Sequence, residues 1–346
     1  MRGPCPPGDR TAVEFERVQT GRDVSSKEIA DFWEDVGIRS PLMDAARLPF
    51  CVDLLPVAAG FASFRNTTVG DFPEKRKIDF QRGLVMQSSD SNQSVFERDA
   101  WQYQSEHYLL PAERVALEKL RLRWNQIDML DLGVGAGRTS WIFSAVERKY
   151  VGVDYALRMI DICREKLKEN DRISFLVDDA AELSKLGAQK FDFILFSYNG
   201  IDCVDENSRL AILNAARDRL RDGDSLFLFS SHNLNVFPFA YQWDFDLQRP
   251  ARTLKNFPRA VWDNVRFWKE NRSQSRDELA KRGWGFFRDG AHNFTLTLCY
   301  ITPEAQIKQL EACGLELLEI IDMAGNTVVN PCSSTDSHLH YLCRLA

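Results

Sequence analysis

The sequence predicts an α/β fold built on a mostly parallel sheet, and three observations carry this prediction. After residue 127, short runs rich in Val, Ile, Leu and Phe alternate with helical stretches, a glycine-rich segment joins the first run to the first helix, and the last two runs have no helical stretch between them. Near-continuous apolar strands separated by helices are typical of a parallel sheet covered on both faces. Because a parallel neighbour needs a crossover, usually a helix, we expect the last strand to be antiparallel.

The apolar runs and helical stretches give the expected elements in order. Seven strands are expected at 127–131, 150–154, 173–177, 191–197, 225–230, 315–322 and 338–345. Helices are expected at 138–148, 156–169, 180–186, 205–221 and 303–313. Pro303 and Gly314 stand at the two ends of the last helix, where these residue types are favoured.

The expected sheet divides the chain into three parts. Residues 127–231 and 302–346 form the core, and residues 232–301 form an insert after the fifth strand. Residues 1–126 precede the sheet, and we expect them to form a mainly helical N-terminal extension. The insert concentrates aromatic residues, which can line a substrate cavity, so we expect it to act as a lid.

The composition bounds the class of protein. Lys and Arg number 44 against 50 Asp and Glu, and this net charge of −6 argues against a protein that coats nucleic acid by bulk positive charge. The eight cysteines include no C-x-x-C pair. The opening residues lack the apolar run of a secretory leader, and the longest uncharged stretch, 225–243, is too polar to span a membrane. We therefore expect a cytoplasmic protein without membrane contact.

A glycine-rich segment, 131–138, ends the first strand and opens the first helix. It reads Asp-Leu-Gly-Val-Gly-Ala-Gly-Arg, and its glycines permit a tight turn and a close approach of the backbone to a ligand. The dehydrogenase fingerprint G-x-G-x-x-G would need glycine where Arg138 stands, which disfavours a nicotinamide cofactor. Asp154 ends the next strand, where a carboxylate can accept hydrogen bonds from both hydroxyls of a ribose.

The chain resembles the class I S-adenosylmethionine-dependent methyltransferases at five segments in the family's order. These are DLGVGAGR (131–138), GVDYALRMI (152–160), FLVDDAAEL (175–183), FDFILFSYNGID (191–202) and LRDGDSLFLFSSHN (220–233). The resemblance covers roughly residues 127–231 and 302–346. It implies a Rossmann-like sheet of seven strands with the last antiparallel, S-adenosylmethionine as cofactor, and methyl-transfer activity.

The resemblance also implies cofactor contacts at the ends of the first four strands. Those for the methionine part are Asp131, Gly133, Gly135 and Gly137, with Ser197 and Tyr198 beside the sulfonium. Those for the adenosine part are Asp154 at the ribose, Tyr155 and Met159 beside the adenine, and Asp179 with Ala180 at its amino edge, with Asp178 as a weaker competitor.

Catalytic groups are expected after the fourth and fifth strands, because ligands bind at the carboxyl ends of strands in open α/β sheets. Methyl transfer is an in-line displacement, and a general base is needed only for a hydroxyl or a protonated amine. Asn199, Asp202 and His232 meet the positional condition, and His232 is the best base because histidine titrates near neutrality. His338 and His340 point the same way along a strand, but no third ligand is placed, so we expect no metal.

The substrate is expected to be a small molecule held by the insert and by residues before the sheet. The residues assigned to it are Tyr103, Tyr108, Tyr241, Trp243 and His292. The basic run 249–272 is opposed only by Asp263 and Glu270, so the substrate could be anionic. Two alternatives stay open: methylation of RNA or protein through this basic insert, and a non-enzymatic protein that only binds the cofactor. A homodimer is also left open.

Overall fold

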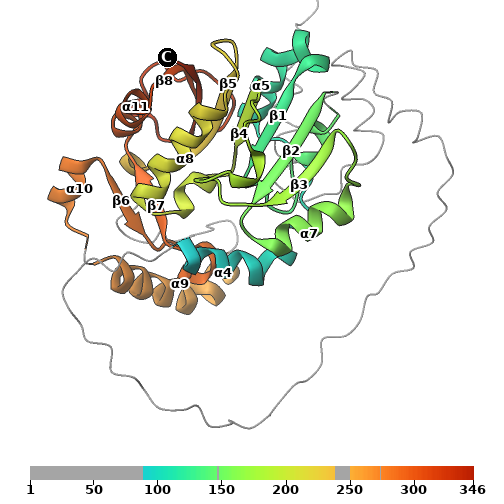
Figure 1. Cartoon of the computed structure of the whole chain (residues 1–346). Helices are drawn as coiled ribbons and strands as arrows, with labels where there is room; N and C mark the ends of the chain where they lie inside the picture. The colour runs from blue at the N-terminus through green and yellow to red at the C-terminus, as the bar shows by residue number, and fades with distance from the viewer. Residues whose placement is uncertain (1–88, 146–147, 238–249, 273) are drawn as a thin grey trace, which may run out of the picture. The chain divides into compact units, whose positions relative to one another are not determined.

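The computed structural model describes residues 89–145, 148–237, 250–272 and 274–346. The seven predicted strands are all present. They are β1 (Asp128–Leu132), β2 (Lys149–Asp154), β3 (Ile173–Val177), β4 (Phe193–Phe196), β5 (Leu226–Asn233), β8 (Leu315–Ile321) and β9 (His338–Leu345). They lie in the order β3-β2-β1-β4-β5-β9-β8 (Figure 1). The first five pair in parallel, and β9 pairs antiparallel with both β5 and β8, which confirms the predicted fold class.

Two further strands come from the insert and join the same sheet. β6 (Trp284–Phe287) and β7 (Leu298–Ile301) form an antiparallel pair, and β7 runs parallel to the last residues of β5. In this register His232 lies opposite Tyr300 of β7 and also opposite His338 of β9. The insert is therefore continuous with the sheet at its carboxyl edge.

Helices cover the sheet, and one core cluster shows how. α8 (Glu206–Arg219) and α11 (Pro303–Ala312) pack apolar side chains such as Leu213 and Leu310 against inward-facing residues of the central strands. The other helices are α4 (Ser89–Asp99), α5 (Pro111–Leu120), α6 (Ser140–Phe143), α7 (Leu157–Lys166), α9 (Pro250–Asn271) and α10 (Arg276–Arg282). Short 3-10 turns occupy Ala100–Tyr103, Arg121–Gln126, Ser184–Leu186, Gly200–Cys203, Leu234–Val236, Ala291–Phe294 and Pro331–Ser333.

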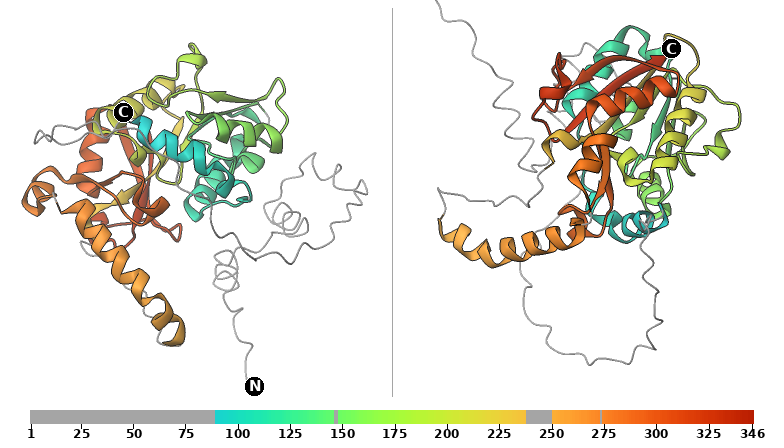
Figure 2. Two further views of the ribbon diagram at one scale, coloured as in Figure 1. Left: turned by 90° about the horizontal axis from the view of Figure 1, so that it is seen from below. Right: turned by 90° about the vertical axis from the view of Figure 1, so that its left-hand side faces the viewer.

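α9 projects from the side of the fold that β6 and β7 form (Figure 2). Its inner face buries Phe267 in a cluster with Phe237 and Phe287. Most of the predicted N-terminal extension lies outside the described residues. No helix in the described part of the chain is both long and apolar enough to cross a membrane.

Two predicted helices are largely wrong, because polar side chains bind elsewhere. The helix expected at 138–148 is only the single turn α6, where Thr139 and Ser140 hydrogen-bond to Asp131 and Tyr150 of the sheet. In place of a helix at 180–186 there is one 3-10 turn. The Asp178 carboxylate closes this loop by accepting hydrogen bonds from Ser184 Oγ and from the Lys185 backbone. Side-chain bonds of this kind compete with helix formation.

Phe229 tests how strongly the β5–β9 pairing stabilises the sheet. Its fully buried ring stacks on Phe227 at a centroid distance of 5.0 Å and on Tyr341 at 5.2 Å. We expect Phe229→Ala to lower the free energy of unfolding by about 3–5 kcal/mol, because the substitution leaves a cavity. Urea denaturation measures this loss. Val329→Ala is the control, since Val329 is 96% exposed and its truncation should change stability by less than about 0.5 kcal/mol. Similar losses in both variants would contradict the prediction.

Candidate active site

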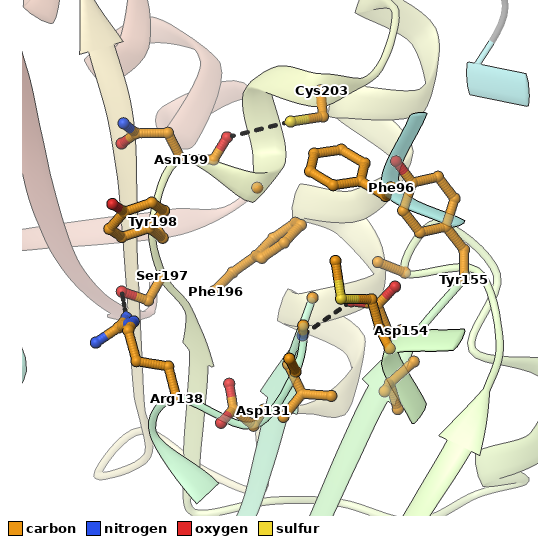
Figure 3. A pocket seen from close by; sticks show the side chains of 18 of the residues that line it. Phe96, Asp131, Arg138, Asp154, Tyr155, Phe196, Ser197, Tyr198, Asn199 and Cys203 are labelled. Atoms are coloured by element: carbon orange, nitrogen blue, oxygen red, sulfur yellow. Dashed lines mark hydrogen bonds between the residues drawn. The ribbon is translucent and has the colours of Figure 1, made fainter. Parts of the chain in front are cut away.

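A pocket lies at the carboxyl ends of the parallel strands (Figure 3). The glycine turn after β1 and Asp154 at the end of β2 line it. The residues that follow β4 and His232 near the end of β5 line it as well. Parallel sheets bind ligands at this edge. The pocket therefore lies where the sequence places the site.

The glycine turn gives the pocket its floor. Gly133, Gly135 and Gly137 all have positive φ, of 57°, 56° and 79°. A Cβ on Gly133 would lie 2.5 Å from Phe196 Cε2, whereas a Cβ on Gly135 would meet nothing closer than 4.0 Å. Gly135 thus faces the pocket, and a side chain there would enter it. Gly137 does not line the pocket.

Asp131 and Asp154 are both buried beside this turn. Asp131 accepts hydrogen bonds from Thr139 Oγ1 and Tyr150 Oη, each at 2.7 Å. Asp154 accepts hydrogen bonds from the backbone N–H groups of Gly135 and Ala156, each at 2.9 Å. Burial raises the pKa of each carboxyl to about 6, although these hydrogen bonds act in the opposite direction. A ligand that offers a cation or hydroxyl donors would favour the ionised form of both.

Arg138 is a pocket residue that the sequence analysis did not assign. Its guanidinium forms a buried ion pair with Glu113 of α5 at 2.5 Å and lies over the rings of Tyr108 and Tyr198, at 5.0 and 5.3 Å. Ser197 donates a hydrogen bond to the same Glu113 carboxylate. Tyr108 does not line the pocket and contributes through Arg138. The position of Arg138 directly after the glycine turn could have indicated that it lies at the pocket. Nothing in the sequence around Glu113 indicates its contact with Arg138, because that contact depends on tertiary packing.

Tyr155, Met159, Asp179 and Ala180, the residues expected beside the adenine, all line the pocket. Phe96 of α4 joins them, with its ring 6.3 Å from that of Tyr155, and the sequence analysis missed it. Asp178 also borders the pocket. Its carboxylate, however, is occupied by the loop that it closes. Asp179 is therefore better placed than Asp178 to meet a ligand.

Asn199, His232, Leu296 and Leu298 line the same pocket. Tyr198 and Asn199 have φ of 56° and 58°, in a region that side chains other than glycine enter at a cost of about 1–2 kcal/mol each. The Asn199 backbone is held there by a 2.8 Å hydrogen bond to Ser230 Oγ. Strained backbone of this kind concentrates at functional sites.

His232 and Asp202 are brought together, but only His232 reaches the pocket. Asp202 is fully buried, and its Oδ2 lies 2.8 Å from His232 Nδ1. Arg209 pairs with the same carboxylate from α8. Asp202, which was predicted to be catalytic, does not line the pocket and contacts His232, which does.

The other predicted substrate residues divide into two groups. Tyr103 lines the pocket. Tyr241 and Trp243 lie outside the described residues, and His292 lies in the 3-10 turn Ala291–Phe294, with its side chain outside the description. Among the described residues, no group of three or more His, Cys, Asp or Glu side chains could hold a metal ion.

Comparison with known proteins gives one family match. Residues 129–223 match the model of a family described as "Methyltransferase domain". No curated protein matches the sequence.

Three solved structures illustrate the likeness in fold. An S-adenosylmethionine-dependent methyltransferase from Mesorhizobium loti is 15% identical, with a TM-score of 0.47 over 67% of this chain and 97% of that chain. One from Clostridium acetobutylicum ATCC 824 is 15% identical, with a TM-score of 0.45 over 68% and 91%. The 1,6-didemethyltoxoflavin-N1-methyltransferase of Burkholderia thailandensis is 13% identical, with a TM-score of 0.45 over 79% and 100%.

The assignment rests on the family match together with the strand order and the glycine turn. All three belong to the core that carries the sequence motifs. Residues 129–223 therefore carry a methyltransferase domain, which indicates a transferase that uses S-adenosylmethionine.

Proposed function

We propose that the protein transfers the methyl group of S-adenosylmethionine to a small molecule. The observation that carries this proposal is that a single pocket contains both halves of the site. Gly135 and Asp154, which we assign to the cofactor, line the same pocket as His232 and Leu298, which we assign to the acceptor. Positioning two reactants in one enclosed site lowers the barrier of an in-line displacement.

The residues present fit the cofactor, whose sulfonium supplies an electrophilic methyl group when it is bound. Gly135 leaves room for a ligand close to the backbone, and Asp131 is a buried carboxylate that can receive the ammonium of the methionine part. Asp154 is placed for the ribose hydroxyls, and Tyr155 with Phe96 for the adenine ring. These assignments follow the residues that border the pocket.

The acceptor end of the pocket favours a small molecule with an apolar body. We assign Leu296 and Leu298 of the pocket lining to it, and pockets of this kind bind small ligands through apolar walls and a few placed polar groups. Among the lining residues that the structure describes, Arg138 is the one Lys or Arg, and Glu113 neutralises it. The described pocket therefore gives no support to an anionic acceptor over a neutral one.

A second candidate function, methylation of RNA or protein, is favoured by the outer face of α9. Trp262 and Trp268 are 67% and 61% exposed there, and Arg272 lies over the Trp268 ring at 5.3 Å. Exposed aromatic and basic side chains suit nucleic-acid contact. This candidate would be favoured if the protein bound a single-stranded RNA, if that binding weakened steeply with salt, and if Trp268→Ala reduced it.

The place of Gly135 in the pocket predicts a loss of cofactor binding on substitution. Gly135→Ala puts a methyl group where the ligand must approach, so calorimetry with S-adenosylhomocysteine should show at least a tenfold weaker Kd, about 1.4 kcal/mol. Gly314→Ala is the matched control. Gly314 also has positive φ, 70°, but it lies outside the pocket, and its Cβ would make only ordinary contact with Arg217 Cδ at 3.6 Å. Equal affinity in both variants would contradict the proposed cofactor position.

The raised pKa values of Asp131 and Asp154, about 6 each, predict that cofactor affinity depends on pH. Binding favours the ionised carboxylates, so affinity should rise with pH up to about 6 and level off above it. One unit below the pKa, each carboxyl that must ionise costs up to about tenfold. Calorimetry across this range measures the effect. Asp131→Asn should make the profile less steep and leave the part due to Asp154, and a flat profile in the wild type would count against these roles.

The small-molecule proposal predicts a methylated product in a metabolite screen. Protein incubated with S-adenosylmethionine and a library of small molecules should yield a compound that is one methylene heavier, detected by mass spectrometry. Asp154→Ala should abolish it through loss of cofactor binding. Methylation of RNA or protein without any small-molecule product would favour the second candidate instead.

A further inference from the structure

The His232 ring, which lines the pocket, is held by Asp202 and by Tyr300. Its Nδ1 lies 2.8 Å from Asp202 Oδ2, and its own backbone N–H donates to the same oxygen at 2.7 Å. The Tyr300 ring packs against it at a centroid distance of 4.7 Å. The imidazole therefore has one preferred orientation.

The ionisation of Asp202 determines which ring nitrogen carries the proton. Burial pushes the pKa of Asp202 upward, but the Arg209 guanidinium and the hydrogen bonds from His232 outweigh it, so the pKa lies below the ordinary carboxyl value. Ser231 Oγ donates a further hydrogen bond at 2.7 Å. An ionised carboxylate only accepts hydrogen bonds, so Nδ1 of His232 must donate. In the neutral ring the lone pair is then on Nε2.

Nε2 faces the side-chain amide of Asn199, which can donate a hydrogen bond to the neutral ring or accept one from the protonated ring. Asn199 Nδ2 lies 3.2 Å from it, and both residues line the pocket. Asn199 Oδ1 is buried and has no hydrogen-bond partner among the described residues. The amide donates to Nε2 while the ring is neutral, so an acceptor hydroxyl must replace this hydrogen bond to reach the lone pair, and a half-turn of the amide would then present Oδ1 to the protonated Nε2.

Other charged or titratable groups face His232 from the neighbouring elements. His338 lies directly opposite it on β9, and Tyr300 of β7 donates a hydrogen bond to Asp289. Arg209 acts from α8 through Asp202. Of these, only the Asp202 carboxylate bonds to the ring, so Asp202 sets its tautomer.

Building on the proposed function, we propose that the methyl acceptor is a hydroxyl compound, an alcohol or a phenol, and that His232 Nε2 removes its proton. The acceptor O–H bond breaks and its proton forms the Nε2–H bond. An oxygen electron pair forms the new C–O bond, and the electron pair of the broken C–S bond stays on sulfur, which becomes a neutral thioether.

A hydroxyl acceptor makes use of this base, whereas an amine that is already neutral does not. A neutral amine attacks through its own lone pair and can release its proton after the transfer. A neutral hydroxyl is a weak nucleophile until it loses its proton, so it needs a base within hydrogen-bond reach. His232 is a catalytic residue in this scheme, and Asp202 is a positioning residue that acts through it.

The tautomer of His232 tests the proposal without a substrate. Long-range ¹H–¹⁵N NMR is recorded on full-length protein with ¹⁵N-labelled histidine, saturated with S-adenosylhomocysteine. The pH is about 8, where histidines are ordinarily neutral. His232→Gln identifies the signal, and His338→Gln is the control that should retain it. We expect the Nδ1–H tautomer. An Nε2–H tautomer or a fully protonated ring would overturn the proposal while leaving cofactor binding, and thus the proposed function, intact.

The acceptor class is tested with a panel of phenols and alcohols matched with amines and thiols of similar shape. O-methylated products are expected, and His232→Gln should slow their formation by about a hundredfold or more with cofactor affinity unchanged. Asp202→Asn should lower the rate and also shift the His232 tautomer, which a purely structural role would not do. Methylation only at nitrogen or sulfur, an unchanged rate in His232→Gln, or no methylated hydroxyl at all would overturn the proposal.

Discussion

The buried ion pair between Asp202 and Arg209 connects most of the acceptor side of the molecule. Both side chains are almost wholly removed from solvent. Such a pair is stable only when the remaining donors and acceptors are also satisfied. Arg209 achieves this by donating to the Ile201 carbonyl at 3.2 Å, to Ser231 Oγ at 2.9 Å and to Gln306 of α11. One charge on α8 thereby holds the turn after β4, the end of β5 and the start of α11 in a fixed relation.

The proposed cofactor and acceptor parts of the pocket differ in whether backbone or side chains shape them. The cofactor end depends on backbone geometry: Gly133 and Gly135 adopt positive φ, so ligand contacts there need no side chain. The proposed acceptor end depends on side chains, and the backbone that carries one of them is strained. Asn199 has positive φ without being glycine, and its backbone N–H is held by a hydrogen bond to Ser230 Oγ. Backbone geometry can serve every member of a family that shares a cofactor, whereas side chains can differ with the acceptor.

The sequence could predict what depends on local pattern, and it failed where packing decides. All seven core strands were predictable because each is an apolar run, and the pocket position followed from the parallel order. The helix expected at 138–148 was wrong because Thr139 bonds to the buried Asp131 rather than to its own turn. Glu113 and Phe96 were missed because each reaches the site from a helix far away in sequence, where no pattern marks the contact.

In the proposed function, the insert would contact the acceptor from strands that belong to the sheet. β7 hydrogen-bonds in register to the end of β5, which fixes Leu298 and Tyr300 relative to His232 by backbone pairing. A wall attached in this way cannot change its distance from the base without breaking the ladder. Changes of side chain along β7 would therefore alter the shape of the acceptor end while leaving the base in place. Under the proposed scheme, selectivity for the acceptor can thus vary independently of His232, because the Asp202 carboxylate, itself paired with Arg209, holds the His232 ring.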